Sequence, residues 1–175
     1  MTNPQSPRPA TDALLRFAAR DFEAWAGLAE DTTVADVAET FEVDDAPQPA
    51  TLGAEHRAVG WLTVAADGYP GGIRVWLDGT SVVLLDGPDP ELPAGLEAFL
   101  HELGDPDVRL DSYLGTLPIE GSEWVYPSRG LTVYLNPENM VILRLAAYVS
   151  TTLDDYEAHV RMDLQTKRLP LQRDG

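Results

Sequence analysis

The 175-residue chain contains no cysteine, one lysine and three histidines. Without cysteine it cannot form a disulfide scaffold, a thiolate zinc site or a cysteine nucleophile. No apolar run is long enough to cross a bilayer, and the N-terminal stretch MTNPQSPRPA lacks the apolar centre of a signal peptide. We therefore expect a cytoplasmic protein without a membrane anchor.

Basic residues are scarce overall, with 12 against 29 acids, giving a formal charge of -17 and a pI near 4.3. A field of this sign repels phosphate backbones and anionic lipids, which excludes non-specific nucleic-acid binding and attachment to membrane surfaces. The predominance of arginine over lysine, with much Ala, Gly and Pro, is typical of a GC-rich genome. The acidity thus has two interpretations: solvated polar faces, or a surface that binds a basic partner.

Sequence motifs of the common catalytic and cofactor sites are missing, including the nucleophile elbow, the dinucleotide and P-loop glycine patterns, the zincin motif and the EF-hand. His56, His101 and His159 are far apart. Asp155, His159 and Asp163 share one face of a predicted helix, but that face lies opposite its apolar stripe, where solvated polar residues are expected. We predict no metal and no cofactor.

The spacing of apolar residues predicts a tail, two helices and a loop in the first third of the chain. Residues 1–10 hold three prolines and no periodicity, which indicates a disordered tail. Apolar residues at three- and four-residue steps over 14–28 predict an amphipathic helix, and a shorter stripe follows over 34–41. The proline-containing stretch 44–54 is predicted to be a loop.

From Arg57 onward, β-branched and aromatic residues alternate with others, and Asp78-Gly79 is typical of a hairpin turn. The predicted strands cover 57–64, 73–77, 82–85, 108–114, 124–126, 130–136 and 140–143. A last helix is predicted from Leu153 to Leu164, with Lys167 and Arg168 at its carboxyl end.

The pattern repeats. At an offset of 58 without gaps, five positions are identical: Gly72/Gly130, Val75/Val133, Leu77/Leu135, Val83/Val141 and Leu85/Leu143. The helical stripe at 34–41 recurs at 96–103, at an offset of 62. A duplicated helix–meander unit explains both offsets. The alternative is that any two hairpins resemble each other, because strands share Val, Ile and Leu.

We therefore predict an α+β fold with an antiparallel sheet of about seven strands, built from two tandem helix–meander units with helices mainly on one face. The N-terminal helix and first unit cover 11–92, and the second unit and last helix cover 93–166. Tails at 1–10 and 167–175 flank one globular body.

Three segments of the second unit carry a family resemblance: Leu103-Gly104-Asp105-Pro106, Glu123-Trp124-Val125-Tyr126 and Gly130–Tyr134. Over about 32–147 the chain resembles the beta-lactamase inhibitory proteins and the small outer-membrane assembly lipoproteins. The resemblance implies tandem modules that present a concave aromatic sheet face to a protein. Secreted members have signal peptides and disulfides, which this chain lacks, and the first unit reads Phe41-Glu42-Val43 at the corner. A beta-lactamase target is therefore not implied.

Strand alternation sorts the side chains of the two hairpins. Ile73 and Val75 are predicted to face the helices, while Arg74, Trp76 and Tyr134 point the other way. If helices cover one side only, an aromatic face is left open for a partner. The predicted binding residues are Trp76, Tyr134, Trp61, Trp124, Tyr126, Arg74 and Arg129. If the N-terminal helix or long loops cover that side, these are core residues instead.

We expect a non-catalytic protein-binding module, such as an intracellular inhibitor, an immunity protein or an adaptor, with a basic protein partner. Arg129 either clamps a carboxylate of the partner or caps a turn. Two alternatives stay open: a small enzyme or small-molecule binder with an aromatic-lined sheet pocket, and an acidic polyanion mimic that inhibits a nucleic-acid enzyme. Oligomeric state and partner identity are not determined by the sequence.

Overall fold

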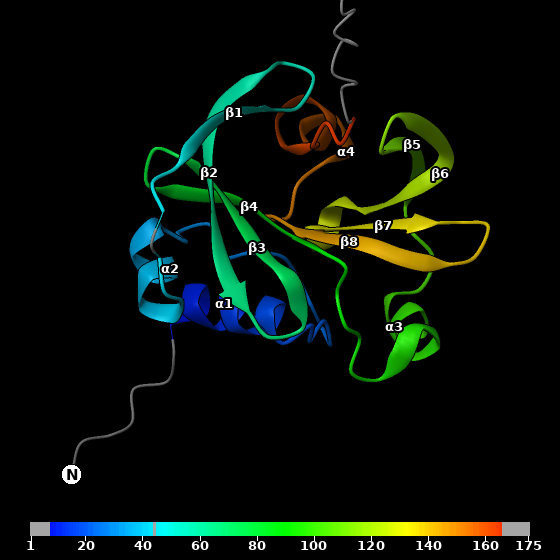
Figure 1. The fold of residues 1–175 in the computed structure, drawn as a ribbon, viewed down its shortest axis with the longest axis horizontal. Coiled ribbons are helices and arrows are strands. Elements are labelled where there is room, and N and C mark those ends of the chain that lie inside the picture. The colour runs from blue at the N-terminus through cyan, green and yellow to red at the C-terminus, as the bar shows by residue number, and fades with distance from the viewer. Residues whose placement is uncertain (1–7, 44, 166–175) are drawn as a thin grey trace, which may run out of the picture.

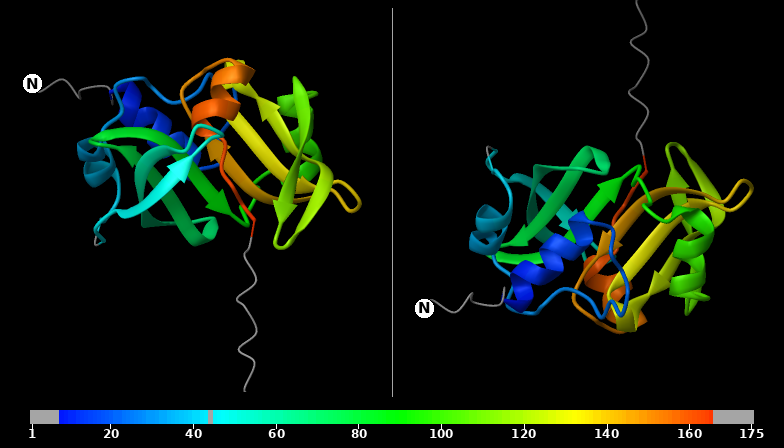
Figure 2. Two further views of the ribbon diagram at one scale, coloured as in Figure 1. Left: turned by 90° about the horizontal axis from the view of Figure 1, so that it is seen from above. Right: turned by 90° about the horizontal axis from the view of Figure 1, so that it is seen from below.

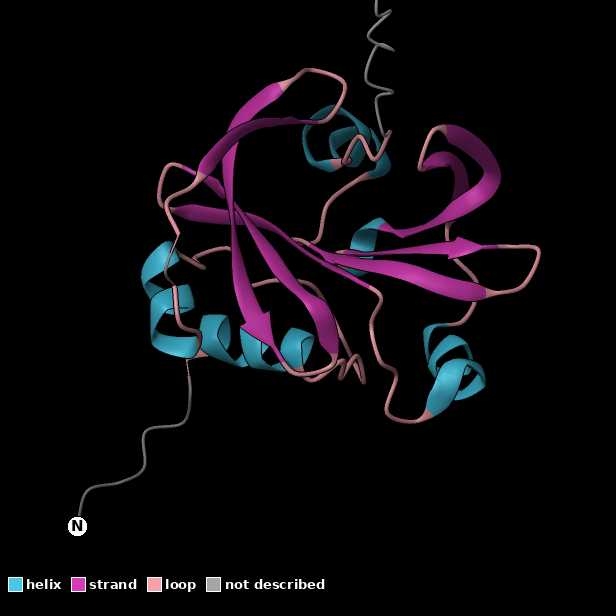
Figure 3. Ribbon diagram, in the orientation of Figure 1, coloured by secondary structure: helices cyan, strands magenta, loops and turns pink. Residues whose placement is uncertain are grey.

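The computed structural model describes residues 8–43 and 45–165 and is an α+β fold with one eight-stranded antiparallel sheet (Figure 1, Figure 3). The strands are β1 (Gln48–Leu52), β2 (Arg57–Ala66), β3 (Tyr69–Asp78), β4 (Ser81–Pro88), β5 (Val108–Leu114), β6 (Leu117–Tyr126), β7 (Leu131–Asn136) and β8 (Val141–Ala147). The helices are α1 (Pro9–Ala18), α2 (Val34–Thr40), α3 (Gly95–Leu103), the 3-10 helix η1 (Pro127–Arg129), and α4 (Leu153–Asp155), which continues as the π-helix η2 (Tyr156–Val160).

The strand order is β1-β2-β3-β4-β8-β7-β6-β5, so the sheet consists of two four-stranded meanders in mirrored order. We call β1–β4 the first half and β5–β8 the second half. The last strands of the halves, β4 and β8, pair with each other from Leu85↔Ala147 to Pro88↔Arg144. This short seam makes one continuous sheet out of two locally connected hairpin sets.

The two halves also share their register. The β3–β4 ladder shifts between Trp76 and Leu77, and the β7–β8 ladder shifts at Tyr134 and Leu135, which lie 58 residues further on. The β7–β8 turn is two residues longer than the β3–β4 turn. Beyond the turn the offset is therefore 60, and Leu85 corresponds to Leu145 rather than to the Leu143 of the ungapped alignment.

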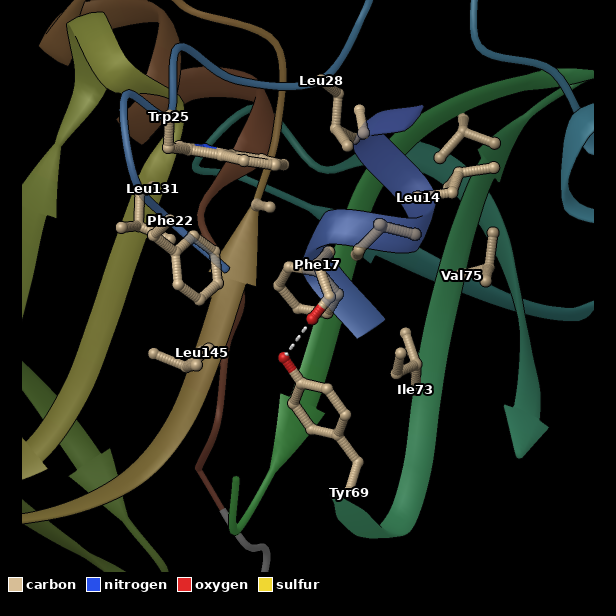
Figure 4. Close-up of a cluster of buried hydrophobic side chains, with 14 of the residues drawn as sticks. Leu14, Phe17, Phe22, Trp25, Leu28, Tyr69, Ile73, Val75, Leu131 and Leu145 are labelled. Carbon is tan, nitrogen blue, oxygen red and sulfur yellow. Dashed lines mark hydrogen bonds between the residues drawn. The ribbon is translucent and has the colours of Figure 1, made fainter. Parts of the chain in front are cut away.

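One face of the sheet, which we call the helical face, packs against α1 and α2 in the first half and against α3 in the second (Figure 1). Ile73 and Val75 point into this layer as predicted, with Leu14 and Phe17 of α1 (Figure 4). The Tyr69 hydroxyl donates a hydrogen bond to the Phe17 carbonyl at 2.8 Å. The amphipathic stripe of α1 thus forms the core that its spacing indicates.

The opposite face, which we call the C-terminal face, is covered as well. The outer hairpins of both halves curl toward this side, and α4 with η2 lies between them over the middle of the sheet (Figure 1, Figure 2). Tyr156 of η2 and Met162 after it are buried against strand residues of both halves. Helices therefore pack on both faces, α1, α2 and α3 on the helical face and α4 with η2 on the other, and the predicted placement mainly on one face is not confirmed.

Helix α1 is shorter than predicted and ends at Ala18. Arg20 and Ala24 have positive φ angles, which a helix cannot accommodate. Phe22 and Trp25 are nevertheless buried, because the extended segment after α1 crosses the sheet and inserts them into the core beside Phe99 of α3.

Strand β1 is the strand that the sequence analysis missed. Its Pro49 and the prolines nearby predicted a loop, yet β1 is an edge strand, where a missing N–H is tolerated. The last predicted helix also differs, because the helical conformation ends at Val160 rather than at Leu164.

The described chain begins in α1 on the helical face and ends at Gln165 on the C-terminal face (Figure 1). The predicted tails at 1–10 and 167–175 lie outside the described residues, except for residues 8–10, of which Pro9 and Ala10 already belong to α1. Lys167 and Arg168 are also outside them.

Candidate functional site

The aromatic residues of the C-terminal face are not accessible. Trp76 and Tyr134 keep 6% and 1% of their surface, and Trp61 is half-buried with its ring centroid 6.5 Å from that of Trp76. They pack in one cluster with Tyr156 and Met162. The covered-face alternative therefore holds for Trp76 and Tyr134, although the cover is the C-terminal segment and not the N-terminal helix.

Trp124 and Tyr126 lie on the opposite side of the sheet, in the helical-face core. The Tyr126 hydroxyl donates to the Gly104 carbonyl at 2.8 Å, and the Trp124 ring lies under the Arg109 guanidinium at 4.7 Å. The seven predicted binding residues thus do not form one surface.

Arg129 is used within the fold. Its guanidinium donates to the carbonyls of Trp25 at 3.2 Å, Leu103 at 3.2 Å and Phe22 at 3.5 Å. It therefore ties the segment after α1 to the end of α3, and a partner carboxylate would have to displace these contacts.

Asp86 is the centre of a buried polar cluster on the C-terminal face. Its side chain is fully buried and accepts hydrogen bonds from Arg74 at 3.0 to 3.2 Å, from Trp76 Nε1 at 2.5 Å and from Arg144. Arg144 belongs to β8, so the cluster crosses the seam between the halves. The Arg74 guanidinium also lies over the rings of Trp61 and Trp76, at 5.5 and 5.1 Å. Predicted residues Arg74, Trp76 and Trp61 are thus brought together, around a carboxylate that the sequence analysis missed.

Glu123 is the corresponding centre in the second half. Its carboxylate is fully buried and accepts from Arg161 Nε and Nη2, at 2.8 to 3.2 Å, and from the Tyr156 hydroxyl. The Tyr134 hydroxyl lies 3.4 Å from that of Tyr156. This cluster attaches the C-terminal segment to β6.

The electrostatics of this second cluster are set by burial. Desolvation raises the pKa of Glu123, although the hydrogen bonds and charge of Arg161 lower it. Desolvation likewise raises the pKa of Tyr156 and of Tyr134 well above the ordinary value of 10.0. Partial burial lowers the pKa of Arg161, but the hydrogen bond and charge of Glu123, together with the neighbouring tyrosines, raise it on balance. Both tyrosines therefore stay protonated and act as hydrogen-bond donors.

The arginines of the described part of the chain contact carbonyl, carboxylate or aromatic groups of the same fold. All nine have such a partner within the fold: Arg8, Arg16, Arg20, Arg57, Arg74, Arg109, Arg129, Arg144 and Arg161. Only three acids of the described segments are buried, namely Asp36, Asp86 and Glu123. Most of these arginines thus serve contacts within the fold, while Arg8 and Arg109 keep more than half of their side-chain surface exposed and most carboxylates lie on the surface.

A cleft of about 790 Å³ opens beside the C-terminal segment. One wall is the turn after β1, the other is β5, and the floor is formed by η2 and the residues after it. Its lining comprises Thr51, Gly53, Ala54, His56, Asp111, Ser112, Tyr113, Glu157, Arg161, Met162, Asp163 and Leu164. The volume is in the range of ligand and peptide sites.

Metal-ligating side chains do not cluster in groups of three or more anywhere in residues 8–43 and 45–165. His159 instead lies 3.6 Å from Glu55, across the gap between η2 and the β1–β2 turn. Among the helices of these same segments, none is long and apolar enough to cross a membrane.

Comparison with known proteins gives no relative. No protein-family model, no curated protein sequence and no solved structure matches the chain. The resemblance to the inhibitory modules therefore stays a prediction from the short motifs of the second unit.

The sequence analysis missed Asp86 and Glu123, the two buried carboxylates that organise the C-terminal face. One signal was present: Asp86 follows the apolar run Val82–Leu85, and Glu123 precedes Trp124-Val125-Tyr126. Acids directly beside buried strand residues need a cation nearby, because an isolated buried charge is costly. In a chain with 29 acids, this signal does not stand out from solvated carboxylates.

Proposed function

We propose that the protein is a non-catalytic protein-binding module whose partner carries a basic surface. One observation carries the proposal: every arginine in the described segments is engaged inside the fold, while nearly all carboxylates point outward. Together with the net charge of -17, this gives the surface a predominantly negative field. Such a field attracts a basic protein and accelerates its association.

The buried carboxylates favour binding over catalysis. An acid or base catalyst needs a carboxyl group that can reach a substrate. Asp86 and Glu123 are fully buried, and each is saturated by two or more donors. Every buried side-chain nitrogen and oxygen of the described segments has a hydrogen-bond partner. These groups are thus arranged as structural ion clusters.

An inhibitor, immunity protein or adaptor fits this arrangement. Such proteins present a rigid surface and undergo little rearrangement on binding. The mirrored halves joined across the seam, with charge clusters on the C-terminal face of each, supply that rigidity. We further propose that the halves descend from one duplicated helix–meander unit, supported by the shared position of the register shift.

Capture from an extract of the native host at low and at high salt tests the proposal. The bait carries its tag at the N-terminus, and captured proteins are identified by mass spectrometry. We expect a basic partner that is retained at about 50 mM salt and lost at about 500 mM, because the Debye length shortens to a few ångströms.

The captured partner is then purified and its association rate measured by stopped flow across the same salt range. We expect a decrease of tenfold or more, roughly what electrostatic steering contributes. An acidic partner, or an association rate indifferent to salt, contradicts the proposal.

A further inference from the structure

The non-helical residues after η2 contact the edge strand β5 at two points. The Arg161 side chain donates from Nη2 to the Asp111 carbonyl at 2.6 Å, and Gln165 forms an isolated parallel β-bridge with Gly115, just after the end of β5. Both contacts join residues 50 positions apart, so the segment 161–165 passes 111–115 in the parallel direction.

The two segments meet at the Arg161–Asp111 contact and at the Gln165–Gly115 bridge, and between these two points they are separated by the cleft. Asp111–Tyr113 line one side of it and Arg161–Leu164 the other. The main chain of Met162–Leu164 makes no hydrogen bond to the main chain of another described residue. β5 pairs with β6 on its inner side only. Between the Asp111 and Gly115 contacts, the cleft is therefore flanked by the unpaired edge of β5 and by residues 162–164 with unused main-chain groups, which is an arrangement that accepts an added strand.

The charge of the cleft lining determines which side chains an added strand would need to carry. Asp111 and Asp163 are exposed at opposite walls, and Glu157 of η2 lies on the floor. The cation in the lining, Arg161, is neutralised by Glu123. The lining is thus net negative, in agreement with the outward field of the whole molecule.

We propose that this cleft binds an extended basic segment of a protein partner, which adds as a strand to the outer edge of β5. Main-chain bonds to β5 supply affinity, and arginine or lysine side chains of the partner reach Asp111 and Asp163. The stretch of β5 between the contacts at Asp111 and Gly115 accommodates about three partner residues. This inference rests on the proposed function and specifies its surface.

The probe is an octapeptide of alternating arginine and threonine, titrated into the full chain. Isothermal calorimetry gives the affinity and backbone amide NMR shifts give the location. A second peptide of the same sequence carries N-methyl groups at alternate residues; it keeps the charge but cannot complete a strand ladder. A third has glutamate in place of arginine.

We expect the first peptide to bind with shifts concentrated at 51–54, 111–115 and 161–165, the methylated peptide to bind at least about tenfold more weakly, and the acidic peptide not to bind. The variant Asp111→Asn/Asp163→Asn should lose about tenfold in affinity. Glu97→Gln/Glu102→Gln on α3, which removes the same charge on the helical face, should stay within about twofold.

Equal binding of the methylated peptide, or equal losses in the two double variants, overturns the strand-addition site while the basic-partner function stands. Absence of binding by the first peptide overturns the site as well. The salt dependence of the captured partner then decides the proposed function separately, because that measurement does not involve the cleft variants.

Discussion

The two halves of the sheet share a frame but differ in what their centres contain. Trp76 and Tyr134 occupy corresponding positions beside the shared register shift, and both are buried on the C-terminal face. Next to Trp76, the first half buries Asp86. Next to Tyr134, the second half buries Glu123, which corresponds by register to Trp61.

The partners of these carboxylates explain the difference. Asp86 is neutralised by sheet residues, Arg74 from its own half and Arg144 from the other, so its cluster joins the halves. Glu123 is neutralised by Arg161, which comes after the sheet is complete. The first cluster therefore stabilises the seam, and the second fixes the C-terminal segment. Corresponding positions in the two halves thus hold different structures together: the two halves in one case, and the sheet and the C-terminal segment in the other.

Removing the corresponding rings should have the largest effect. Trp76→Ala and Tyr134→Ala each leave a cavity in a covered face, and we expect losses of about 3–5 kcal/mol in the free energy of unfolding, measured by urea denaturation. Trp61→Ala, at a half-buried ring, should cost less, about 1–2 kcal/mol. Folded and fully stable variants with impaired partner binding would contradict the burial of Trp76 and Tyr134 described above.

The second-largest loss of stability is expected at the seam cluster, by which we mean Asp86 with Arg74, Trp76 and Arg144. Asp86→Asn keeps the shape but leaves Arg74 and Arg144 without a countercharge, and we expect a loss of about 3 kcal/mol by the same measurement. Asp36→Asn, at another buried acid that lies away from the seam, serves as control for a simple loss of buried charge. Equal losses at both sites would show that the seam cluster contributes no more to the free energy of unfolding than another buried acid does.

Glu123 should give a smaller effect that depends on pH. Its pKa is raised above 4.5 in the folded protein, so the folded state holds this proton more tightly than the unfolded chain. The stability that the group contributes is complete below its ordinary pKa and is lost as pH rises through the raised value. Glu123→Gln cannot titrate.

Wild type should therefore lose stability relative to Glu123→Gln as pH rises from the ordinary pKa of the carboxyl group through the raised one, by about 1.4 kcal/mol for each pH unit by which the pKa is raised. Urea denaturation of both proteins across this range measures the difference. A difference that grows in favour of wild type with pH would mean that the bond to Arg161 outweighs burial.

The smallest effect is expected at an ion pair found in one half only. Arg57 pairs with Asp78 at 2.7 Å, but both side chains are substantially exposed, at 34% and 48%. The second half has Asn136 at the position that corresponds to Asp78. Asp78→Asn should change the free energy of unfolding by less than about 0.5 kcal/mol, by thermal or urea denaturation. A larger loss would mean that the first half depends on this pair.

Local patterns predicted the repeated part of this fold well. The turn at Asp78-Gly79 and the alternation of Ile73 and Val75 identified a hairpin and the face that it buries. Thr33 and Asp36 have the three-residue spacing of a capping box, and at the start of α2 Thr33 N donates to Asp36 Oδ2 at 2.8 Å. Each of these signals involves residues close in sequence.

The candidate site was not predictable in the same way, because it depends on distant contacts. The cover over Trp76 comes from residues around Tyr156 and Met162, whose spacing indicated only one more helix. Gly53 explains how closely that cover approaches: a Cβ there would overlap the Ala158 carbonyl, and its N–H donates to the Arg161 carbonyl at 2.8 Å. The contact of Gly53 with residues about a hundred positions away cannot be predicted from the sequence around Gly53.

The described chain begins on the helical face and ends on the C-terminal face, which matters for how this protein is immobilised. An anchor attached ahead of α1 holds the molecule by the face on which α1 lies (Figure 1), and the cleft beside β5 is on the other face. Gln165, where the described chain ends, lies beside that cleft, next to the lining residue Leu164. The choice of end thus decides which side of the molecule a sensor chip or resin can sample.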